Sequence, residues 1–483
     1  MGKTDDVALC ETHASDPSIT LPAGTAMPRA PGLEIGKTFR GLKIRGLLGQ
    51  GAMGQAYLAS HVSLRVPVVI KLFRQAGIDP LSEAHLAARI GSPWVVPVLD
   101  AGIEQGMPYV MQRYVDGIDL DELLAIHDAA DRSIPVATLV RFAVHVFHGL
   151  SAIHVAGVVH RDIKPPNLFL NGSGDAMVGD LGIAVDPTGT HHAAVAGTPL
   201  FIAPELWTGG HASVRSDLYS AGATLHLLWQ RKPPFAAGSA MELARLHCDE
   251  PYTAPKSTDP VGAYFGAVLA RLLSKTPEER PESALAAART LERIAMPAPE
   301  LRGHGDGVAN VGNVVIHIEH KRIATATTDV IVSAANETME MDTGVSGALR
   351  AAGGDEILKE LRTHGPQTMG RVTWTKGGKL KCTDIAHAVA AAGGAICIQR
   401  TVLRTLFEAE RRGHRPVTFP ALGTGVGGVP HGLSARLVLE AIRTFASFSP
   451  RHTRSIRIAL PTPETLAQWT TGLLALDADA AHR

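Results

Sequence analysis

The stretch HRDIKPPN at His160–Asn167, followed by DLG at Asp180–Gly182, decides the fold of the first half of this chain. It brings two carboxylates and a carboxamide into a spacing that suits phosphoryl transfer from ATP. One carboxylate of such a site meets the attacking hydroxyl, while the other acid and the amide hold Mg²⁺ against the phosphates. We therefore expect Asp162 to face the hydroxyl, and Asn167 and Asp180 to be the metal ligands.

A glycine-rich loop upstream, GQGAMG, holds Gly49, Gly51 and Gly54 between two expected strands. Glycine allows the backbone to close over phosphates and to point N–H groups at them. The chain continues as a strand after this loop, whereas a dinucleotide-binding loop would open a helix. The apolar strand VVIK then ends at Lys71, a point charge suited to the α- and β-phosphates.

These motifs, in this order, resemble the eukaryotic-like Ser/Thr protein kinases of bacterial type. The resemblance implies a bilobal α+β protein kinase fold over residues 39–295, with ATP and Mg²⁺ (or Mn²⁺) as cofactors. It implies that Lys71 pairs with Glu83 on an early helix and that Lys164 balances charge on the transferring phosphoryl group. Asp162 would then accept or steer the proton of the acceptor hydroxyl.

Further matches concern the framework of such a kinase. The stretch GTPLFIAPE at Gly197–Glu205 resembles the end of an activation segment. Asp217 resembles the helix residue that braces the catalytic loop, and Arg280 is placed to pair with Glu205. These three matches imply structural roles.

Control and substrate class also follow from the resemblance. Arg161, next to Asp162, marks family members that are switched by a phosphate on the activation segment, and Thr188 and Thr190 are the nearest acceptors. Lys164 together with Thr198 indicates the Ser/Thr class.

The expected roof over adenine departs from the family. Ala56 stands where relatives usually have Val, and Val69 stands where they usually have Ala, so the exchange conserves volume. A degenerate kinase without activity is the alternative. The presence of Lys71, Asp162 and Asn167 argues against it.

After a Pro- and Gly-rich linker at 296–307, strands expected at 314–318, 330–332, 417–419 and 456–459 alternate with helices expected near 347–362 and at 434–446. This alternation predicts a three-layer α/β/α domain over 308–483. The strand DVIVSAAN, ending at Asn336, and two Gly-rich loops resemble the macro domain family, which recognises ADP-ribose. The resemblance implies that Asn336 binds the distal ribose and that backbone N–H groups of the loops bind the diphosphate. The loop residues expected to do so are Gly344, Val345 and Ser346, then Gly423, Thr424, Gly425, Val426 and Gly428.

Two departures bear on this pocket. Arg322 falls where the family carries an adenine-binding Asp, so adenine recognition does not follow from the resemblance. Ser346 falls where hydrolytic members of one branch carry an Asp, which favours binding of ADP-ribose over hydrolysis of an ADP-ribosyl bond.

Composition limits the partners. The 483 residues carry 46 basic and 46 acidic side chains, so no global charge favours nucleic acid or an anionic membrane. No run approaches the ~20 apolar residues of a membrane span. Residues 1–38 predict a flexible leader without a signal peptide. Four widely spaced cysteines indicate reduced thiols, and we expect a cytoplasmic protein.

The sequence thus predicts a Ser/Thr protein kinase that phosphorylates a protein substrate, followed by a macro domain that binds ADP-ribose or a related nucleotide. An ADP-ribosylated protein is a further expected partner. Two alternatives stay open: a macro domain that removes ADP-ribose under control of the kinase, and a scaffold in which both sites are inert. Fusion suggests that the second domain targets or regulates the first.

Overall fold

The computed structural model describes residues 32–50, 54–63, 66–73, 84, 86–181, 199–305, 307–390 and 395–481. Residues Leu33–Arg483 form one compact unit. Its described residues contain a six-stranded, a three-stranded and an eight-stranded sheet. Seven residues named above lie outside the described ranges: Gly51, Glu83, Gly182, Thr188, Thr190, Gly197 and Thr198.

The six-stranded antiparallel sheet forms the N-terminal lobe (N-lobe) of the first domain, in the order β1-β2-β3-β4-β6-β5. Its strands are β1 (Thr38–Phe39), β2 (Leu42–Gln50), β3 (Gly54–His61), β4 (Pro67–Phe73), β5 (Val98–Glu104) and β6 (Met107–Arg113). Ile70 and Leu72 of β4 are buried in a cluster with Ile44 and Tyr57. Because side chains alternate along a strand, Val69 and Lys71 face the other side of the sheet.

The predicted leader ends earlier than residue 38. The N–H of Leu33 donates to the hydroxyl of Tyr57 at 3.1 Å, and Leu33 packs against the N-lobe cluster. Thr38 already belongs to β1 and pairs with Lys43. The boundary was missed because a short edge strand after a Pro- and Gly-rich stretch has no periodicity of its own.

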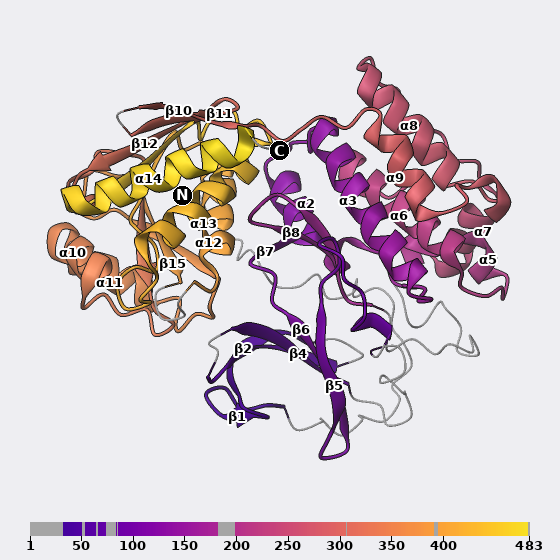
Figure 1. Cartoon of the computed structure of the whole chain (residues 1–483), viewed down its shortest axis with the longest axis horizontal. Helices are drawn as coiled ribbons and strands as arrows, with labels where there is room; N and C mark the ends of the chain where they lie inside the picture. Colours follow the sequence, from indigo (N-terminus) through magenta and orange to yellow (C-terminus); the bar gives the residue numbers. More distant parts are fainter. Residues whose placement is uncertain are drawn as a thin grey trace, which may run out of the picture. The chain divides into compact units, whose positions relative to one another are not determined.

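The C-lobe is mostly helical and includes a small three-stranded sheet (Figure 1). The helices are α2 (Leu120–Ala129), α3 (Val136–Val155), α5 (Pro204–Trp207), α6 (Val214–Gln230), α7 (Ala240–Asp249), α8 (Pro260–Leu272) and α9 (Ala284–Glu292). Most of these helices cap their first turns with Asp or Ser side chains, such as Asp119 and Ser213, whereas α3 and α5 have no side-chain cap. The strands are β7 (Gly117–Asp119), β8 (Leu168–Asn171) and β9 (Ala176–Val178).

Among the described residues, α3 alone is long and apolar enough to cross a membrane, judged by length and composition. The sequence predicted no such run. However, 61% of its most apolar 18-residue window is buried, and the helix packs against α6, α9 and β9 in the C-lobe. A central core helix meets the same criteria, so α3 is weak evidence for a membrane span.

The eight-stranded mixed sheet belongs to the second domain, in the order β10-β11-β12-β17-β16-β13-β15-β14. Strands β12, β17, β16, β13 and β15 are parallel to one another. The strands are β10 (Leu301–Gly305), β11 (Val308–Val311), β12 (Val314–His320), β13 (Val330–Ala335), β14 (Val372–Lys376), β15 (Asp384–Val389), β16 (Pro416–Phe419) and β17 (Ser455–Leu460).

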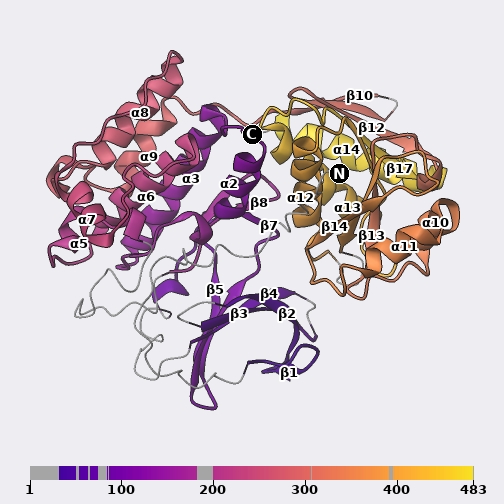
Figure 2. The same ribbon diagram turned by 180° about the vertical axis from the view of Figure 1, so that it is seen from behind.

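Helices cover both faces of this sheet (Figure 2), which confirms the three-layer prediction. In β13, Val330 and Val332 are buried in one hydrophobic cluster, whereas Ile331 and Ala335 are buried in another. The first cluster includes side chains of α12 (Ile398–Arg411), α13 (His431–Ala446) and α14 (Pro463–Ala481). The second includes side chains of α10 (Gly344–Gly353) and α11 (Asp355–Arg362).

Two boundaries of this domain are corrected. Leu301–Gly305, inside the predicted linker, is strand β10 and pairs with β11, so the sheet begins at Leu301. The helix expected over 347–362 is interrupted at Gly354, which adopts φ 97° and separates α10 from α11. A left-handed glycine ends one helix, and the next starts in a new direction.

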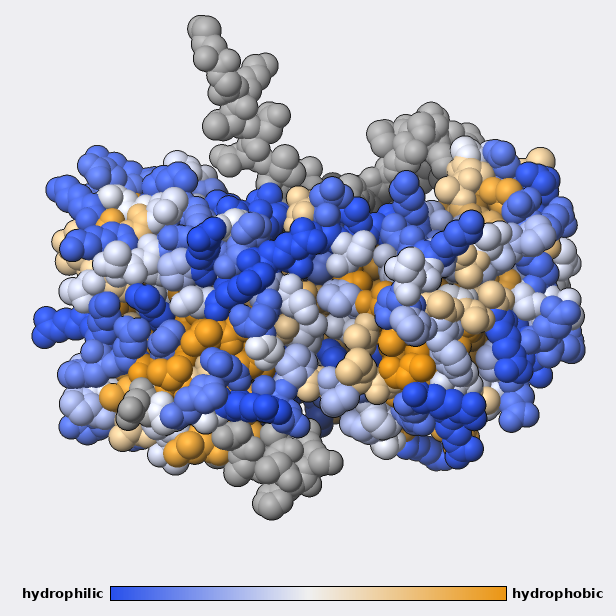
Figure 3. Space-filling view, turned by 90° about the horizontal axis from the view of Figure 1, so that it is seen from above, coloured by the Kyte–Doolittle hydropathy of each residue, from blue (hydrophilic) through white to orange (hydrophobic). Residues whose placement is uncertain are grey.

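The surface is mostly hydrophilic on the face drawn in Figure 3, where hydrophobic residues form separate patches. Exposed large apolar side chains such as Val155, Met241 and Val426 come from distant parts of the chain. Scattered exposure of this kind is usual for folded domains and marks no interface by itself.

Candidate active site and ligand pocket

The catalytic loop between α3 and β8 brings Asp162, Lys164 and Asn167 together. Lys164 Nζ lies 3.0 Å from Asp162 Oδ2. The Asn167 side-chain amide donates to Asp162 Oδ2 at 2.8 Å and to the Asp162 carbonyl at 2.7 Å. The carboxylate of Asp162 is therefore held in one orientation from two sides, while about a fifth of it stays exposed to a substrate.

Asp217 of α6 braces this loop, as the sequence predicted. Its carboxylate accepts the N–H groups of His160 at 2.8 Å and Arg161 at 2.9 Å, and it contacts His154 Nε2 at 2.8 Å. Arg161 has φ 68°, a conformation that non-glycine residues rarely adopt. The buried carboxylate of Asp217 holds the loop in this strained form next to Asp162.

Lys71 and Asp180 form an ion pair that joins strand β4 to the segment after β9. The two side chains are about a quarter exposed. Asp180 has φ 56°, and His160 Nε2 contacts the carbonyl of the preceding residue, Gly179, at 2.9 Å. The predicted partner of Lys71, Glu83, lies outside the described residues, so that pairing stays a prediction.

The glycines of the predicted phosphate loop differ in their surroundings. A side chain at Gly54 would place its Cβ 1.8 Å from the carbonyl oxygen of Leu72 in the neighbouring strand, whereas nothing lies within 4 Å of the equivalent atom at Gly49. Gly54 is therefore required for the close approach of β3 to β4. Its place at the start of β3 supports the roof of the cleft.

Cross-strand pairing places the expected adenine roof. Ala56 of β3 lies opposite Lys71 of β4, and Val69 lies opposite Leu58. Directly opposite residues of antiparallel strands share one face, so Ala56, Val69 and Lys71 line the same side of the N-lobe sheet.

The donor chemistry of this site fits Mg²⁺. Asn167 uses its amide N–H₂ group on Asp162, which leaves its Oδ1 as an oxygen donor, and Asp180 supplies a carboxylate. No group of three His, Cys, Asp or Glu side chains in the described part of the chain is arranged to hold a metal by itself. Two protein ligands agree with an ion that takes its remaining oxygens from phosphates and water.

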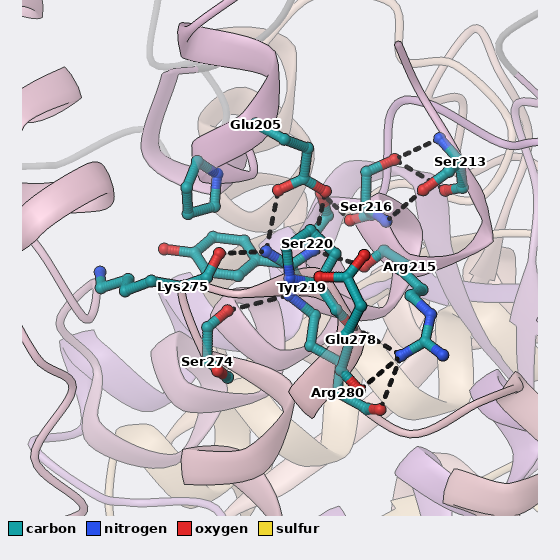
Figure 4. Close-up of polar contacts among 12 residues, drawn as sticks. Glu205, Ser213, Arg215, Ser216, Tyr219, Ser220, Ser274, Lys275, Glu278 and Arg280 are labelled. Atoms are coloured by element: carbon teal, nitrogen blue, oxygen red, sulfur yellow. Dashed lines mark hydrogen bonds and ion pairs between the residues drawn. The ribbon is translucent and has the colours of Figure 1, made fainter. Parts of the chain in front are cut away.

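The predicted pair of Glu205 and Arg280 is confirmed (Figure 4). Arg280 Nη1 and Nη2 each lie 2.8 Å from one carboxylate oxygen of Glu205. The Arg280 side chain is fully buried and also donates to the carbonyls of Ser274 and Arg215, each at 2.9 Å. The guanidinium lies 5.0 Å from the ring centre of Tyr219. Two segments far apart in the chain are thereby joined beneath the substrate-binding side of the C-lobe.

In the second domain, the two Gly-rich loops follow β13 and β16, which are hydrogen-bonded parallel neighbours. Their carboxyl ends share one edge of the sheet, where open α/β sheets bind ligands. Helix α10 begins there at Gly344 (φ 61°) without a side-chain cap. The N–H groups of Val345 and Ser346 have no acceptor among the described residues, as suits an anion-binding helix start.

The second loop is closed on itself. The N–H of Val429 donates to the carbonyl of Gly423, and that of Gly428 donates to Gly425, each at 3.0 Å. Thr424 Oγ1 donates to the carbonyl of Ala421. In the described part of the chain, the N–H groups of Gly425 and Val426 meet no acceptor, and Val426 is 85% exposed. The loop therefore offers backbone donors at the sheet edge.

Four polar side chains at or near this edge of the sheet are placed as follows. Asn336 Oδ1 accepts the N–H of Glu340 at 3.0 Å, which fixes the turn after β13. Ser346 donates its hydroxyl to the carbonyl of Thr343 at 3.0 Å. Arg322 is exposed at the start of a short turn after β12. Asp342, next to the first loop, pairs with Arg350 and is largely exposed.

Two further cavities lie away from these sites. One of about 310 Å³ lies against Ile70 and Tyr109, on the N-lobe face opposite Lys71. The other, of about 470 Å³, lies where α6 and α9 begin, beside His154. Neither contains a residue predicted to bind ATP or ADP-ribose.

Comparison with known families identifies both domains. The protein kinase domain model matches residues 42–291, about half of the chain, and the macro domain model matches residues 332–438. The chain therefore belongs to the protein kinase family and carries a C-terminal macro domain.

Similar proteins are found in bacteria. Serine/threonine-protein kinase PknH of Mycobacterium bovis is 33% identical over 269 residues, which cover 53% of this chain and 44% of that protein. Serine/threonine-protein kinase pkn3 of Myxococcus xanthus is 31% identical over 321 residues, 61% of this chain and 58% of that protein. The crystal structure of the Mycobacterium tuberculosis PknI kinase domain matches with 26% identity and a TM-score of 0.41, covering 55% of this chain and all of that one. The chain thus spans about half the length of these two curated relatives.

Proposed function

We propose that the first domain transfers the γ-phosphoryl group of ATP to a Ser or Thr hydroxyl of a protein. The assembled network of Asp162, Lys164 and Asn167 carries this proposal. It lies in one lobe, while Lys71 reaches Asp180 from the other. A scaffold with an inert site has no need to hold these two groups of side chains, one of three and one of two, each in contact.

Each side chain has a task in this reaction. The carboxylate of Asp162 orients the acceptor hydroxyl and takes up its proton. Lys164, now beside Asp162, is within reach of the transferring phosphoryl group and balances its charge. Mg²⁺ supplies charge neutralisation at the phosphates when bound, with Asn167 and Asp180 as its protein ligands.

Asp162→Asn tests this proposal in the full chain. Labelled ATP and Mg²⁺ are supplied with a mixture of Ser-, Thr- and Tyr-containing peptides. We expect incorporation to fall by about 10²- to 10⁴-fold, because the variant keeps the size of the side chain and loses the base. Asp249→Ala, an exposed change on α7, should keep wild-type incorporation. Equal labelling in wild type and Asp162→Asn, or labelling of Tyr alone, contradicts the proposal.

For the second domain, we propose binding of ADP-ribose, free or attached to a protein. Several backbone N–H groups of the two loops meet no acceptor among the described residues, which supports binding of a diphosphate. Asn336, at the same edge of the sheet, supports binding of a ribose. Binding is favoured over hydrolysis because the hydroxyl of Ser346 donates its hydrogen bond to the carbonyl of Thr343. No acid stands at that position.

Calorimetry on the full chain tests this second proposal. We expect heat with ADP-ribose and about tenfold weaker binding for Asn336→Ala, which loses hydrogen bonds to the ligand. Asn313→Ala, on the far side of the sheet, is the matched control. If no heat is detected at millimolar ADP-ribose, the proposal is wrong. If the chain releases ADP-ribose from a modified protein, the second domain is a hydrolase and not only a binding domain.

A further inference from the structure

Three residues, Tyr114–Asp116, connect β6 of the N-lobe to β7 and α2 of the C-lobe, and we call them the hinge segment. The macro domain contacts this segment and its surroundings. Its helix α12 lies against β7 and α2, and its Cys397 lies 3.3 Å from the hydroxyl of Tyr114. The hinge segment is thus covered by a second domain.

Asp116 acts as the cap of α12. Its two carboxylate oxygens accept the N–H groups of Gln399 at 3.0 Å and Arg400 at 2.9 Å, in the first turn of that helix. The helix has no side-chain cap of its own, since the residue at the capping position is Cys397 in a left-handed conformation (φ 65°). A carboxylate at a helix start satisfies free N–H groups and is attracted by the helix dipole.

Charged pairs beside the hinge segment strengthen this contact. Glu122 of α2 binds Arg404 with both carboxylate oxygens and contacts Arg400 at 3.2 Å. Burial would raise the pKa of Glu122, but Arg404 and Arg400 outweigh it and lower the pKa. The two arginines project from α12, so the helix is fixed at its start and one turn further on.

The macro domain also contacts the N-lobe. Leu58 and Tyr114 are buried in one cluster with Met369 and Ile396, and Val69 packs against it. Val69 is the expected roof over adenine, on the same face as Lys71. The macro domain thus packs against the N-lobe sheet next to the nucleotide cleft.

On the C-lobe side, the contacts are hydrogen bonds and aromatic packing. Thr138 donates to the carbonyl of Ser447, and Thr444 donates to that of Gly172, each at 2.7 Å and each buried. His127 of α2 packs on Phe448, with ring centres 5.5 Å apart. The macro domain therefore contacts both lobes and the hinge segment between them.

We propose that the macro domain braces the kinase hinge, with Asp116 as the positioning residue, and that this brace maintains the affinity of the cleft for ATP. Lobe movement in a kinase is absorbed by the few residues that connect the lobes. The hinge segment is restrained on one side by α12. On the other side, the macro domain packs against Leu58 and Val69 of the N-lobe. In this braced form, Lys71 already reaches Asp180. The proposal rests on ATP binding by the first domain.

The experiment compares full-length Asp116→Ala with wild type and with Asp249→Ala, an exposed change far from the interface. ATP affinity is measured by calorimetry at pH 7.5, above the value of about 6 to which burial raises the pKa of Asp116. Calorimetry makes the result independent of phosphoryl transfer. Hydrogen exchange of Gln399 and Arg400 reports the cap directly.

We expect Asp116→Ala to weaken ATP binding about fivefold, the effect of losing one helix cap, and to speed exchange at Gln399 and Arg400. Asp116→Asn keeps an acceptor oxygen and should restore most of the affinity, which a general loss of packing would not allow. Should Asp116→Ala fail to fold, Glu122→Gln tests the same brace by loosening Arg404. Faster exchange with unchanged ATP affinity overturns the proposal, as does unchanged exchange. Failure of phosphoryl transfer alone, with the expected affinities, would instead contradict the kinase activity.

Discussion

At the scale of single residues, Arg280 shows how a buried charge holds distant segments together. Its guanidinium is fully buried against the carboxylate of Glu205. Removing one partner of such a pair leaves a buried charge without compensation. We expect Arg280→Met to lower the free energy of unfolding by about 3–5 kcal/mol, measured by urea denaturation. The double variant Arg280→Met with Glu205→Gln should recover part of this loss. If the two single effects simply add, the pair does not couple as the geometry requires.

A second residue-scale prediction concerns pH. His387 is fully buried in β15, with Nε2 2.8 Å from Thr375 Oγ1, and burial lowers its pKa to about 3. Between pH 6.5 and 3, the unfolded chain binds a proton that the folded chain excludes, so stability falls as pH drops through this window. The loss is at most about 1.4 kcal/mol per pH unit, and full stability is present above pH 6.5.

Urea midpoints measured from pH 7.5 to 5 test this in the full chain. His387→Gln removes the titrating ring and should flatten the pH dependence. It should not abolish it, because burial also lowers the pKa values of His127, His226 and His247 to about 4. His452→Gln, at an exposed position, is the control. An identical slope for His387→Gln and wild type contradicts the assignment.

At the scale of elements, the break between α10 and α11 rests on one glycine. Gly354 has φ 97°, so a side chain there is strained, whereas Gly432 in α13 has open space around it. We expect Gly354→Ala to lower the unfolding free energy by about 1 kcal/mol and Gly432→Ala to raise it by up to about 1 kcal/mol. The two substitutions add the same methyl group, and thermal unfolding compares them. Effects of the same sign would refute the explanation.

The sequence predicted the elements whose pattern is local. Strands β12, β13, β16 and β17 and helix α13 follow from apolar runs and helical spacing. It did not predict α12, because the helix start is capped by Asp116, 283 residues away in the chain from Gln399. Strand β10 was not predicted because it contains Gly303 and Gly305, and glycine is disfavoured in strands. Asp162, Lys164 and Asn167 could be named from their motif, but the contact of Lys71 with Asp180 needed the folded chain.

At the scale of the whole molecule, the kinase C-lobe and the macro domain share buried side chains. Phe142 of α3 and Phe448 after α13 lie in one hydrophobic cluster, with ring centres 6.0 Å apart. Glu410 of α12 binds Arg132 after α2 and also accepts three backbone N–H groups of its own domain. Contacts of this depth couple the two domains energetically, because neither can move without exposing apolar surface.

This coupling predicts that the ligands of the two domains affect each other. Strand β15 ends at Val389 on the edge that carries Asn336, and α12, which Asp116 caps, begins at Ile398. We expect ADP-ribose bound at this edge, as proposed above, to restrain the strand ends next to the braced helix. We expect saturating ADP-ribose to tighten ATP binding about fivefold, and ATP to tighten ADP-ribose binding by the same factor, because linkage is reciprocal. Calorimetry with each ligand in the presence of the other measures both factors. Asp116→Ala should remove the coupling and leave the affinity for ADP-ribose unchanged. If ADP-ribose does not change the affinity of the wild-type chain for ATP, the brace does not transmit ligand binding.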